Sequence, residues 1–264
     1  MSTKGRLLQN GISVGGDKTR QLAHAKTGLL TQGPSNGPWG KAPGPFVDPA
    51  AAIRFHEDFF EINKNDSDEV GWLVTAIQGA GNTLIVAPLN GYGGEAKCST
   101  GTTTGDGDYV QWHAKIASPV ATSGKIWFTA KVAIAQTSAM FQVGLSQVLS
   151  ADPFGAGGIT DGIWFTHGST NVLSANVEEA ANTSTDTGIT MAINTYYELG
   201  FLFDGPNDRV LFYVDNVLVH TEETIANIPE NVDLVPFFSY KTAADAARNV
   251  YFDWISFIQK RTGV

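Results

Sequence analysis

YYELGFLFDGPNDRVLFYVDNVLVHT, residues 196–221, is the stretch that decides the fold. Its first part places apolar residues at every second position, which is the period of a half-buried strand. DGPND, residues 204–208, then turns the chain, because glycine reaches positive φ, proline fixes φ and Asx side chains bond the backbone. Alternation resumes over residues 209–214, and Asp215-Asn216 is a second turn whose residues both tolerate the left-handed conformation. The stretch therefore predicts an antiparallel three-stranded meander with one buried face.

The chain beyond residue 50 repeats this alternation in many short segments. The clearest segment runs over residues 125–135, where every second residue from Ile126 to Ile134 is apolar. Residues 91–108, rich in Gly, Thr and Ser, are expected to form a long loop, and Pro236 is expected near a sheet edge or a bulge. Other expected strands lie near residues 53–59, 72–74, 84–86, 109–116, 141–145, 163–167, 172–177, 188–193, 234–240 and 250–258. About a dozen short strands without an amphipathic helix predict an all-β fold, an antiparallel two-sheet jelly-roll sandwich.

Residues 1–50 show neither the period of a helix nor the alternation of a strand. They are expected to form an extended Gly/Pro-rich basic arm, with the jelly-roll domain at residues 51–264. The arm carries six Lys and Arg against two Asp, in a chain of net charge −9, so the body is acidic. An acidic body repels nucleic acid, so no direct nucleic-acid role is expected, and an acidic protein surface is the better partner for the arm. The candidate contact residues of the arm are Lys4, Arg6, Lys18, Arg20, Trp39 and Phe46.

Neither a membrane nor a secretion route is expected from the sequence. No run of apolar residues approaches the ~18 residues of a membrane span. The N-terminal residues also lack the uninterrupted apolar core of a signal peptide. The single cysteine, Cys98, excludes an internal disulfide and is expected to be a small residue of the 91–108 loop rather than a reactive thiol.

No catalytic residue, metal ligand or cofactor is expected. Glycosidases on sandwich folds need two carboxylates on one strand face, and no strand carries a Glu-x-Asp-x-x-Glu pattern. The carboxylate clusters at residues 66–69 and 106–108 are interpreted as solvated loop charges, with a calcium site as the alternative. The five histidines are far apart and are expected on strand surfaces or in the core. No Gly-x-Ser-x-Gly elbow occurs, so the chain is not expected to be an enzyme.

Carbohydrate binding is harder to dismiss than catalysis. Sugar rings stack on exposed aromatic side chains, and several strands of this chain carry an aromatic residue on the outward face. Trp127 lies on the face of its strand opposite to Ile126 and Phe128. Tyr213 and Tyr251 are placed in the same way on their own strands. These three residues are the candidates for glycan stacking, and burial of their rings is the alternative.

Three motifs resemble known families when they are taken in their order along the chain. FYVDNVLV, residues 212–219, is similar to the FYVDG-hydrophobic run of laminin-G-like and concanavalin A-like jelly rolls. NVYFDWISFIQKR, residues 249–261, resembles the last strand of a bacteriophage virion family with that fold. FHEDFF, residues 55–60, followed by Trp72, resembles the start of the sandwich in the same phage proteins. The likeness covers residues 53–261.

The resemblance implies that the first and last strands pair, with Phe55 and Phe59 near the last strand. It also implies a phage structural protein of the capsid decoration or cement type, bound to the major capsid protein on the virion surface as a homo-oligomer such as a trimer. The alternative is a glycan-binding, lectin-like module of a virion or tail that recognises a receptor.

Overall fold

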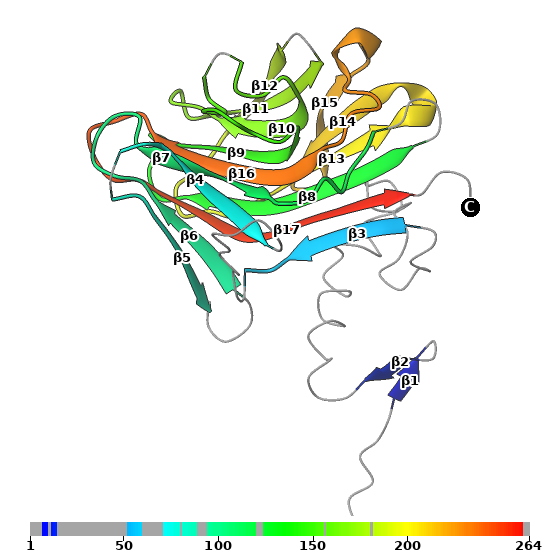
Figure 1. The fold of residues 1–264 in the computed structure, drawn as a ribbon, viewed down its shortest axis with the longest axis horizontal. Coiled ribbons are helices and arrows are strands. Elements are labelled where there is room, and N and C mark those ends of the chain that lie inside the picture. The colour runs from blue at the N-terminus through cyan, green and yellow to red at the C-terminus, as the bar shows by residue number, and fades with distance from the viewer. Residues whose placement is uncertain are drawn as a thin grey trace, which may run out of the picture.

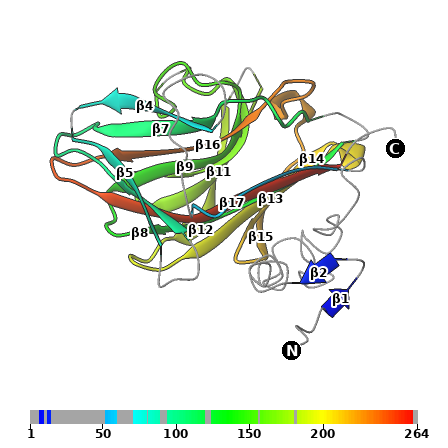
Figure 2. The same ribbon diagram turned by 60° about the horizontal axis from the view of Figure 1, so that its bottom comes forward.

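The computed structural model describes residues 7–9, 12–14, 52–59, 71–79, 81–88, 94–119, 124–155, 157–179 and 182–260. Two antiparallel sheets pack face to face, as Figures 1 and 2 show from two sides. The prediction of an all-β, two-sheet antiparallel sandwich is confirmed. Within the described ranges, no helix has the length and apolar character needed to cross a membrane. The candidate arm residues Lys4, Arg6, Lys18, Arg20, Trp39 and Phe46 all lie outside the described residues.

The first sheet has seven strands in the order β12-β11-β10-β9-β16-β7-β4. In that order the strands are β12 (Asn182–Thr190), β11 (Val172–Glu179), β10 (Asp161–His167), β9 (Ala139–Ser146), β16 (Val235–Thr242), β7 (Gly107–Trp112) and β4 (Trp72–Gln78). We call it the β9 sheet.

The second sheet, here called the β8 sheet, has eight strands. Seven follow the order β15 (Val217–Glu222), β14 (Arg209–Val214), β13 (Tyr197–Asp204), β8 (Lys125–Ile134), β17 (Asn249–Lys260), β6 (Gly94–Ser99) and β5 (Thr83–Pro88), and β3 (Ala52–Glu57) also pairs with β17. Two short 3-10 turns, η3 (Gly205–Asn207) and η4 (Ile225–Asn227), flank β14 and β15. Strands β1 (Leu7–Gln9) and β2 (Ile12–Val14) pair with each other as a separate two-stranded sheet.

The core lies between the two sheets and is built from the inward residues of both. In β8 these are every second residue from Ile126 to Ile134, all at 0% exposure, as the alternation predicts. The rings of Phe165 from the β9 sheet and Phe212 from the β8 sheet meet edge to face, with centroids 5.3 Å apart. Aromatic pairs of this kind join the two layers by packing alone.

The meander of residues 196–221 has the predicted turns and faces. Asp208 closes the first turn with φ 47°, and Asp215 and Asn216 form the second with φ 48° and 65°. Two consecutive left-handed residues are the requirement of a tight hairpin that follows the strand twist. Leu199, Phe201 and Phe203 of β13 are all buried at 0% exposure, as expected.

The last strand, β17, lies inside its sheet, which accounts for its apolar residues on both faces. On one side it pairs with β8, and on the other it pairs first with β6 and then with β3. Phe55 of β3 lies opposite Phe257 of β17, and their rings stack with centroids 5.7 Å apart. The expected pairing of the first sandwich strand with the last is confirmed.

The expected loop at residues 91–108 was wrong, because β6 occupies its middle. Gly94, Ala96 and Cys98 point inward and are buried, while the residues between them are half-buried. These inward side chains are small, so the alternation has no apolar signature in the sequence. Cys98, at 0% exposure, is therefore a core residue of a strand and not a loop residue.

Pro236 does not mark a sheet edge, since β16 runs between β9 and β7. The pairing of β16 with β7 begins one residue later, at Phe237, whereas Pro236 faces Leu145 of β9. A proline is tolerated there because no β7 residue in the ladder lies opposite it to accept a hydrogen bond.

Removal of residues 1–50 is expected to leave a β-rich far-UV circular dichroism spectrum and a cooperative thermal transition. Within the described residues, β1 and β2 pair only with each other, and every ladder of the sandwich lies between Ala52 and Lys260. The truncated chain, expressed beside the full chain, provides the test. A molten or insoluble product would show that the first 50 residues complete the sandwich.

Candidate functional site

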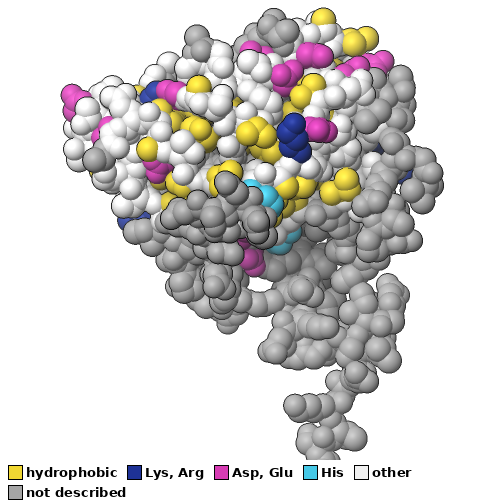
Figure 3. Space-filling view, in the orientation of Figure 1, with side chains coloured by type: hydrophobic (Ala, Val, Ile, Leu, Met, Phe, Trp, Pro, Cys, Tyr) yellow, Lys and Arg dark blue, Asp and Glu magenta, His cyan; other side chains and the backbone are white. Residues whose placement is uncertain are grey.

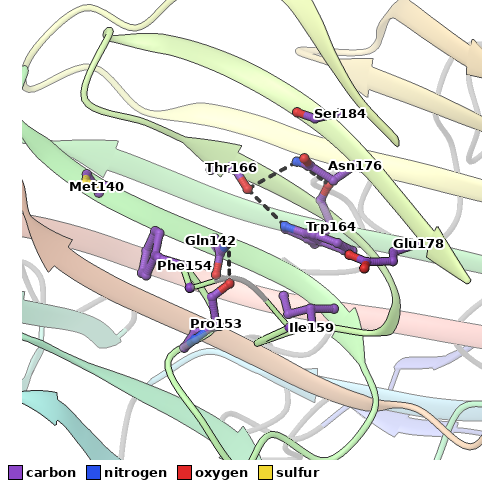
Figure 4. Close-up of a pocket in the computed structure, with 12 residues that line it drawn as sticks. Met140, Gln142, Pro153, Phe154, Ile159, Trp164, Thr166, Asn176, Glu178 and Ser184 are labelled. Atoms are coloured by element: carbon purple, nitrogen blue, oxygen red, sulfur yellow. Dashed lines mark hydrogen bonds between the residues drawn. The ribbon is translucent and has the colours of Figure 1, made fainter. Parts of the chain in front are cut away.

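A pocket of about 340 Å³ lies on the outward face of the β9 sheet. Its base is formed by neighbouring outward positions of β9, β10, β11 and β12, which the strand register places side by side. Residues 152–155 and 157–160, which lie in the connection from β9 to β10 and are here called the 152–160 loop, fold over these strands as the opposite wall. The lining residues are Met140, Gln142, Pro153, Phe154, Gly155, Gly157, Ile159, Trp164, Thr166, Asn176, Glu178 and Ser184 (Figure 4).

Trp164 lies at the centre of this face and is held in place by a second apolar cluster. The cluster is outside the sandwich core and contains Tyr109, Leu149, Ile159, Trp164 and Phe237. Gly144 of β9 lies opposite Trp164, and a Cβ at that position would come within 2.6 Å of the Cα of Trp164. Glycine at this position therefore lets the chain of β9 lie directly against Trp164.

Thr166 and Asn176 present one oriented donor and one oriented acceptor to the pocket. The hydroxyl oxygen of Thr166 accepts hydrogen bonds from Trp164 Nε1 at 2.9 Å and from Asn176 Nδ2 at 3.1 Å. Both acceptor positions of that oxygen are then used, so its proton is left to donate. Asn176 Nδ2 also donates to Ser174 O at 3.2 Å, and among the described residues no donor bonds Asn176 Oδ1. Figure 4 shows both side chains beside Trp164.

Phe154 is half-buried at the rim, and the loop that carries it is tied down at several points. Asp152 Oδ1 accepts the backbone N–H of Phe154 at 2.9 Å, and Asp152 Oδ2 pairs with Lys241 Nζ at 2.7 Å. The same Nζ lies 5.7 Å from the centre of the Phe154 ring. Gln142 Nε2 donates to Pro153 O at 3.2 Å. These contacts hold the Phe154 ring in place, and a side chain that is already ordered loses less entropy on binding.

Glu178 of β11 lines the end of the pocket beside Trp164 (Figure 4). Burial raises the pKa of its carboxyl group above the ordinary value, and the charge of Asp161 raises it further. The neighbouring Glu179 behaves in the same way, since burial, Glu230 and Asp161 each raise its pKa. Several carboxyl groups therefore lie close enough at this end of the pocket to raise the pKa of Glu178 and Glu179.

The three residues that the sequence predicted for glycan stacking do not meet in this pocket. Trp127 is 2% exposed and packs with Ala52 and Ile258, so its ring has no open face for a sugar. Tyr213, at 9% exposure, and the half-buried Tyr251 lie on the outward face of the other sheet. Burial, more than the charge of Glu95, raises the pKa of Tyr251.

The carboxylates of residues 106–108 are not the solvated loop charges that the sequence indicated. Asp106 and Asp108 are 2% and 6% exposed. Asp108 accepts hydrogen bonds from the hydroxyl of Tyr240 and from Asn82 Nδ2, and Asp106 Oδ2 accepts the N–H of Thr103. Asp108 thus joins the start of β7 to Tyr240 of β16 and to Asn82, and Asp106 closes the turn that precedes β7. The other cluster, at residues 66–69, lies outside the described residues.

Two further observations bear on metal binding. Among the described residues, no group of three or more His, Cys, Asp or Glu side chains is arranged to hold a metal ion. His167, at 0% exposure, is a core histidine whose ring nitrogens contact Ala139 O and Asn171 Oδ1, and burial lowers its pKa.

The sequence did not identify the pocket residues, although they left a signal. In residues 163–167 the core-facing Ile163, Phe165 and His167 alternate with Trp164 and Thr166. A tryptophan and a threonine on the outward face of one strand, with Asn176 opposite on the next, indicate a face that is neither core nor simply solvated. The sequence pattern could not show that the 152–160 loop lies over Trp164, Thr166 and Asn176 and closes a pocket there.

Comparison with known proteins identifies the fold. No family model matches the chain, and no curated protein matches its sequence. Among solved structures, a protein of unknown function, SO2946 from Shewanella oneidensis MR-1, matches with a TM-score of 0.54 and 15% identity over 97% of this chain and 100% of that protein. An endo-1,3-beta-glucanase from Streptomyces sioyaensis matches with a TM-score of 0.53 and 14% identity, over 83% of this chain and 99% of the glucanase.

Peanut lectin matches with a TM-score of 0.50 and 10% identity, over 81% of this chain and 99% of the lectin. At these identities the likeness concerns the fold and not the activity. The jelly-roll part of the resemblance seen in the sequence is confirmed. The chain has the concanavalin A-like jelly-roll sandwich fold that lectins and glucanases share.

Proposed function

We propose that the protein binds carbohydrate in the pocket between the 152–160 loop and strands β9–β12, without cleaving it. The observation that carries the proposal is a pair of pocket-lining residues: Thr166, which is left with a proton to donate, and Asn176, whose Oδ1 receives no hydrogen bond among the described residues. A sugar hydroxyl both donates and accepts a hydrogen bond, so it matches such a pair. Phe154 adds a half-buried ring at the rim, on which the apolar face of a sugar can rest.

Two further points support binding over cleavage. The pocket volume, about 340 Å³, is at the small end of ligand sites and suits one or two sugar rings. Glycoside hydrolysis requires two carboxylates across the scissile bond. Among the described residues that line the pocket, Glu178 is the one acidic residue. The fold is compatible with either outcome, because both a lectin and a glucanase have it.

The test is a glycan array followed by titration calorimetry of the best glycan with the wild type and with Asn176→Ala and Phe154→Ala. Each substitution is expected to weaken binding about tenfold, because each removes one hydrogen bond or one stacking surface of roughly 1.4 kcal/mol. Tyr251→Ala, on the other sheet, should bind as the wild type does, and chromatography should recover the oligosaccharide intact.

Two outcomes would contradict the proposal. If no glycan binds, the protein has no sugar-binding role of this kind. If Tyr251→Ala loses affinity while both pocket variants keep it, the sugar lies on the face that the sequence first indicated.

The capsid decoration role stays a prediction. It depends on an arm that contacts a capsid and on Trp39 and Phe46 as apolar anchors, and these residues lie outside the described part of the chain. Binding of arm-deleted protein to undecorated capsids is its direct test.

A further inference from the structure

The strongest feature of the pocket that a neutral sugar would leave unused is Glu178. Its carboxylate is half-buried and lines the cavity. Among the ion pairs of the described residues, none involves Glu178. A carboxylate in a partly buried site is stabilised by a charged donor, and the described residues supply none to Glu178.

The surroundings of Glu178 strengthen its negative field. Asp161, across the β10–β11 ladder, pairs in register with Glu179, and Gly162 pairs with Glu178. The turn η4, which precedes Glu230, lies against β11. Figure 3 shows acidic side chains at the top of that view, where Figure 1 draws β11 and β12 beside β14 and β15.

Lys241, a described basic side chain near the rim of the pocket, does not offset this field. Lys241 Nζ is already paired with Asp152 Oδ2 at 2.7 Å, and it lies at the opposite wall, over Phe154. An anionic sugar such as a uronic acid would therefore face Glu178 without a free cation to receive its carboxylate. The repulsion between like charges in a partly dry pocket costs more than in water.

A cationic group, in contrast, meets two favourable partners in the same cavity. Glu178 supplies the countercharge, and the half-buried ring of Phe154 lines the same space, whereas Trp164, at 2% exposure, forms the floor of the cavity. Aromatic faces attract ammonium groups, most strongly when these are partly desolvated. The hydroxyl-matching pair of Thr166 and Asn176 lies next to Trp164 on the adjoining positions of β10 and β11.

We infer that the ligand is an amino sugar with a free ammonium group, which is held by Glu178 while a neighbouring hydroxyl bonds Thr166 and Asn176. The inference rests on the proposed function, because it names the class of sugar that the same pocket takes. Sugars with a carboxylate are excluded, and neutral sugars bind more weakly.

The test uses four tetrasaccharides of β-1,4 linkage in calorimetric titrations at pH 6. They are the tetramers of glucosamine, glucose, N-acetylglucosamine and glucuronic acid. The glucosamine tetramer is expected to bind at least tenfold more tightly than the glucose tetramer, because a hydrogen bond between charged groups is stronger than one between neutral groups. The glucuronic acid tetramer should show no binding.

Glu178→Gln is the variant that isolates the charge, since it keeps the size and one acceptor oxygen of the side chain. It should bind the glucosamine and glucose tetramers equally. Glu179→Gln, which removes a carboxylate from the next residue of β11 but not from the pocket, should keep the tenfold preference.

The outcomes separate the two proposals. Equal binding of the glucosamine and glucose tetramers by the wild type, with no effect of Glu178→Gln, would overturn the amino-sugar inference and leave the sugar-binding function standing. Tighter binding of the glucuronic acid tetramer would also overturn it. Failure of all four to bind, together with an empty glycan array, would overturn both.

Discussion

Replacing Phe212 with alanine is expected to lower the free energy of unfolding by about 3–5 kcal/mol, the usual cost of truncating a buried phenylalanine. Phe212 is 0% exposed in β14, at the middle of the meander. Its ring contacts Phe165 of the other sheet edge to face at 5.3 Å and lies 5.9 Å from Phe201 of the neighbouring strand. The cavity would open between the two layers, where neither sheet can move to close it. Chemical denaturation followed by circular dichroism measures the loss.

Leu218→Ala is the matched control, since it truncates an apolar side chain of the neighbouring strand β15 that is 49% exposed. Its expected effect is within about 0.5 kcal/mol of the wild type. If Phe212→Ala cost no more than Leu218→Ala, the two sheets could not be packed through these rings as described.

Replacing Gly144 with alanine is expected to damage both stability and the pocket. A Cβ on Gly144 would lie 2.3 Å from the backbone oxygen of Ile163 and 2.6 Å from the Cα of Trp164. Backbone atoms cannot rotate away, so β9 and β10 must separate, at a cost of about 1–3 kcal/mol or more. The shift would also displace Trp164, which holds the hydroxyl of Thr166. Denaturation curves and sugar titrations of the same preparation would measure both losses.

Gly168→Ala controls for the loss of a glycine as such. Gly168 follows β10 directly, and a Cβ there would meet no atom within 4 Å. This variant is expected to keep both stability and sugar affinity. A Gly144→Ala protein that unfolds and binds like Gly168→Ala would mean that the close approach of β9 to Trp164 does not exist.

Much of the fold could be predicted from the sequence where large side chains alternate. The meander and β8 bury a phenylalanine, leucine, isoleucine or valine at nearly every inward position, so the period was readable. The resemblance predicted that Phe55 lies near the last strand, β17. The stacked rings of Phe55 and Phe257 confirm this prediction. In β6 the inward residues are Gly94, Ala96 and Cys98, and with so little apolar surface the strand looked like a loop.

The site could not be predicted in the same way, because it depends on contacts between distant segments. The sequence assigned Trp127 to an outward face correctly, but burial of that face depends on Ala52 and Ile258. Trp164 is also on an outward face, and the 152–160 loop turns that face into a pocket. Pairings such as Lys241 with Asp152, which hold that loop, join residues that no local pattern relates.

A crystal structure of the protein with the glucosamine tetramer is the measurement that tests the central claim most directly. The account predicts a sugar ring against Phe154 in the pocket of the β9 sheet, with one hydroxyl bonded to both Thr166 and Asn176 and an ammonium group at Glu178. A sugar bound beside Tyr213 or Tyr251 on the β8 sheet, or an empty pocket at saturating ligand, would contradict it.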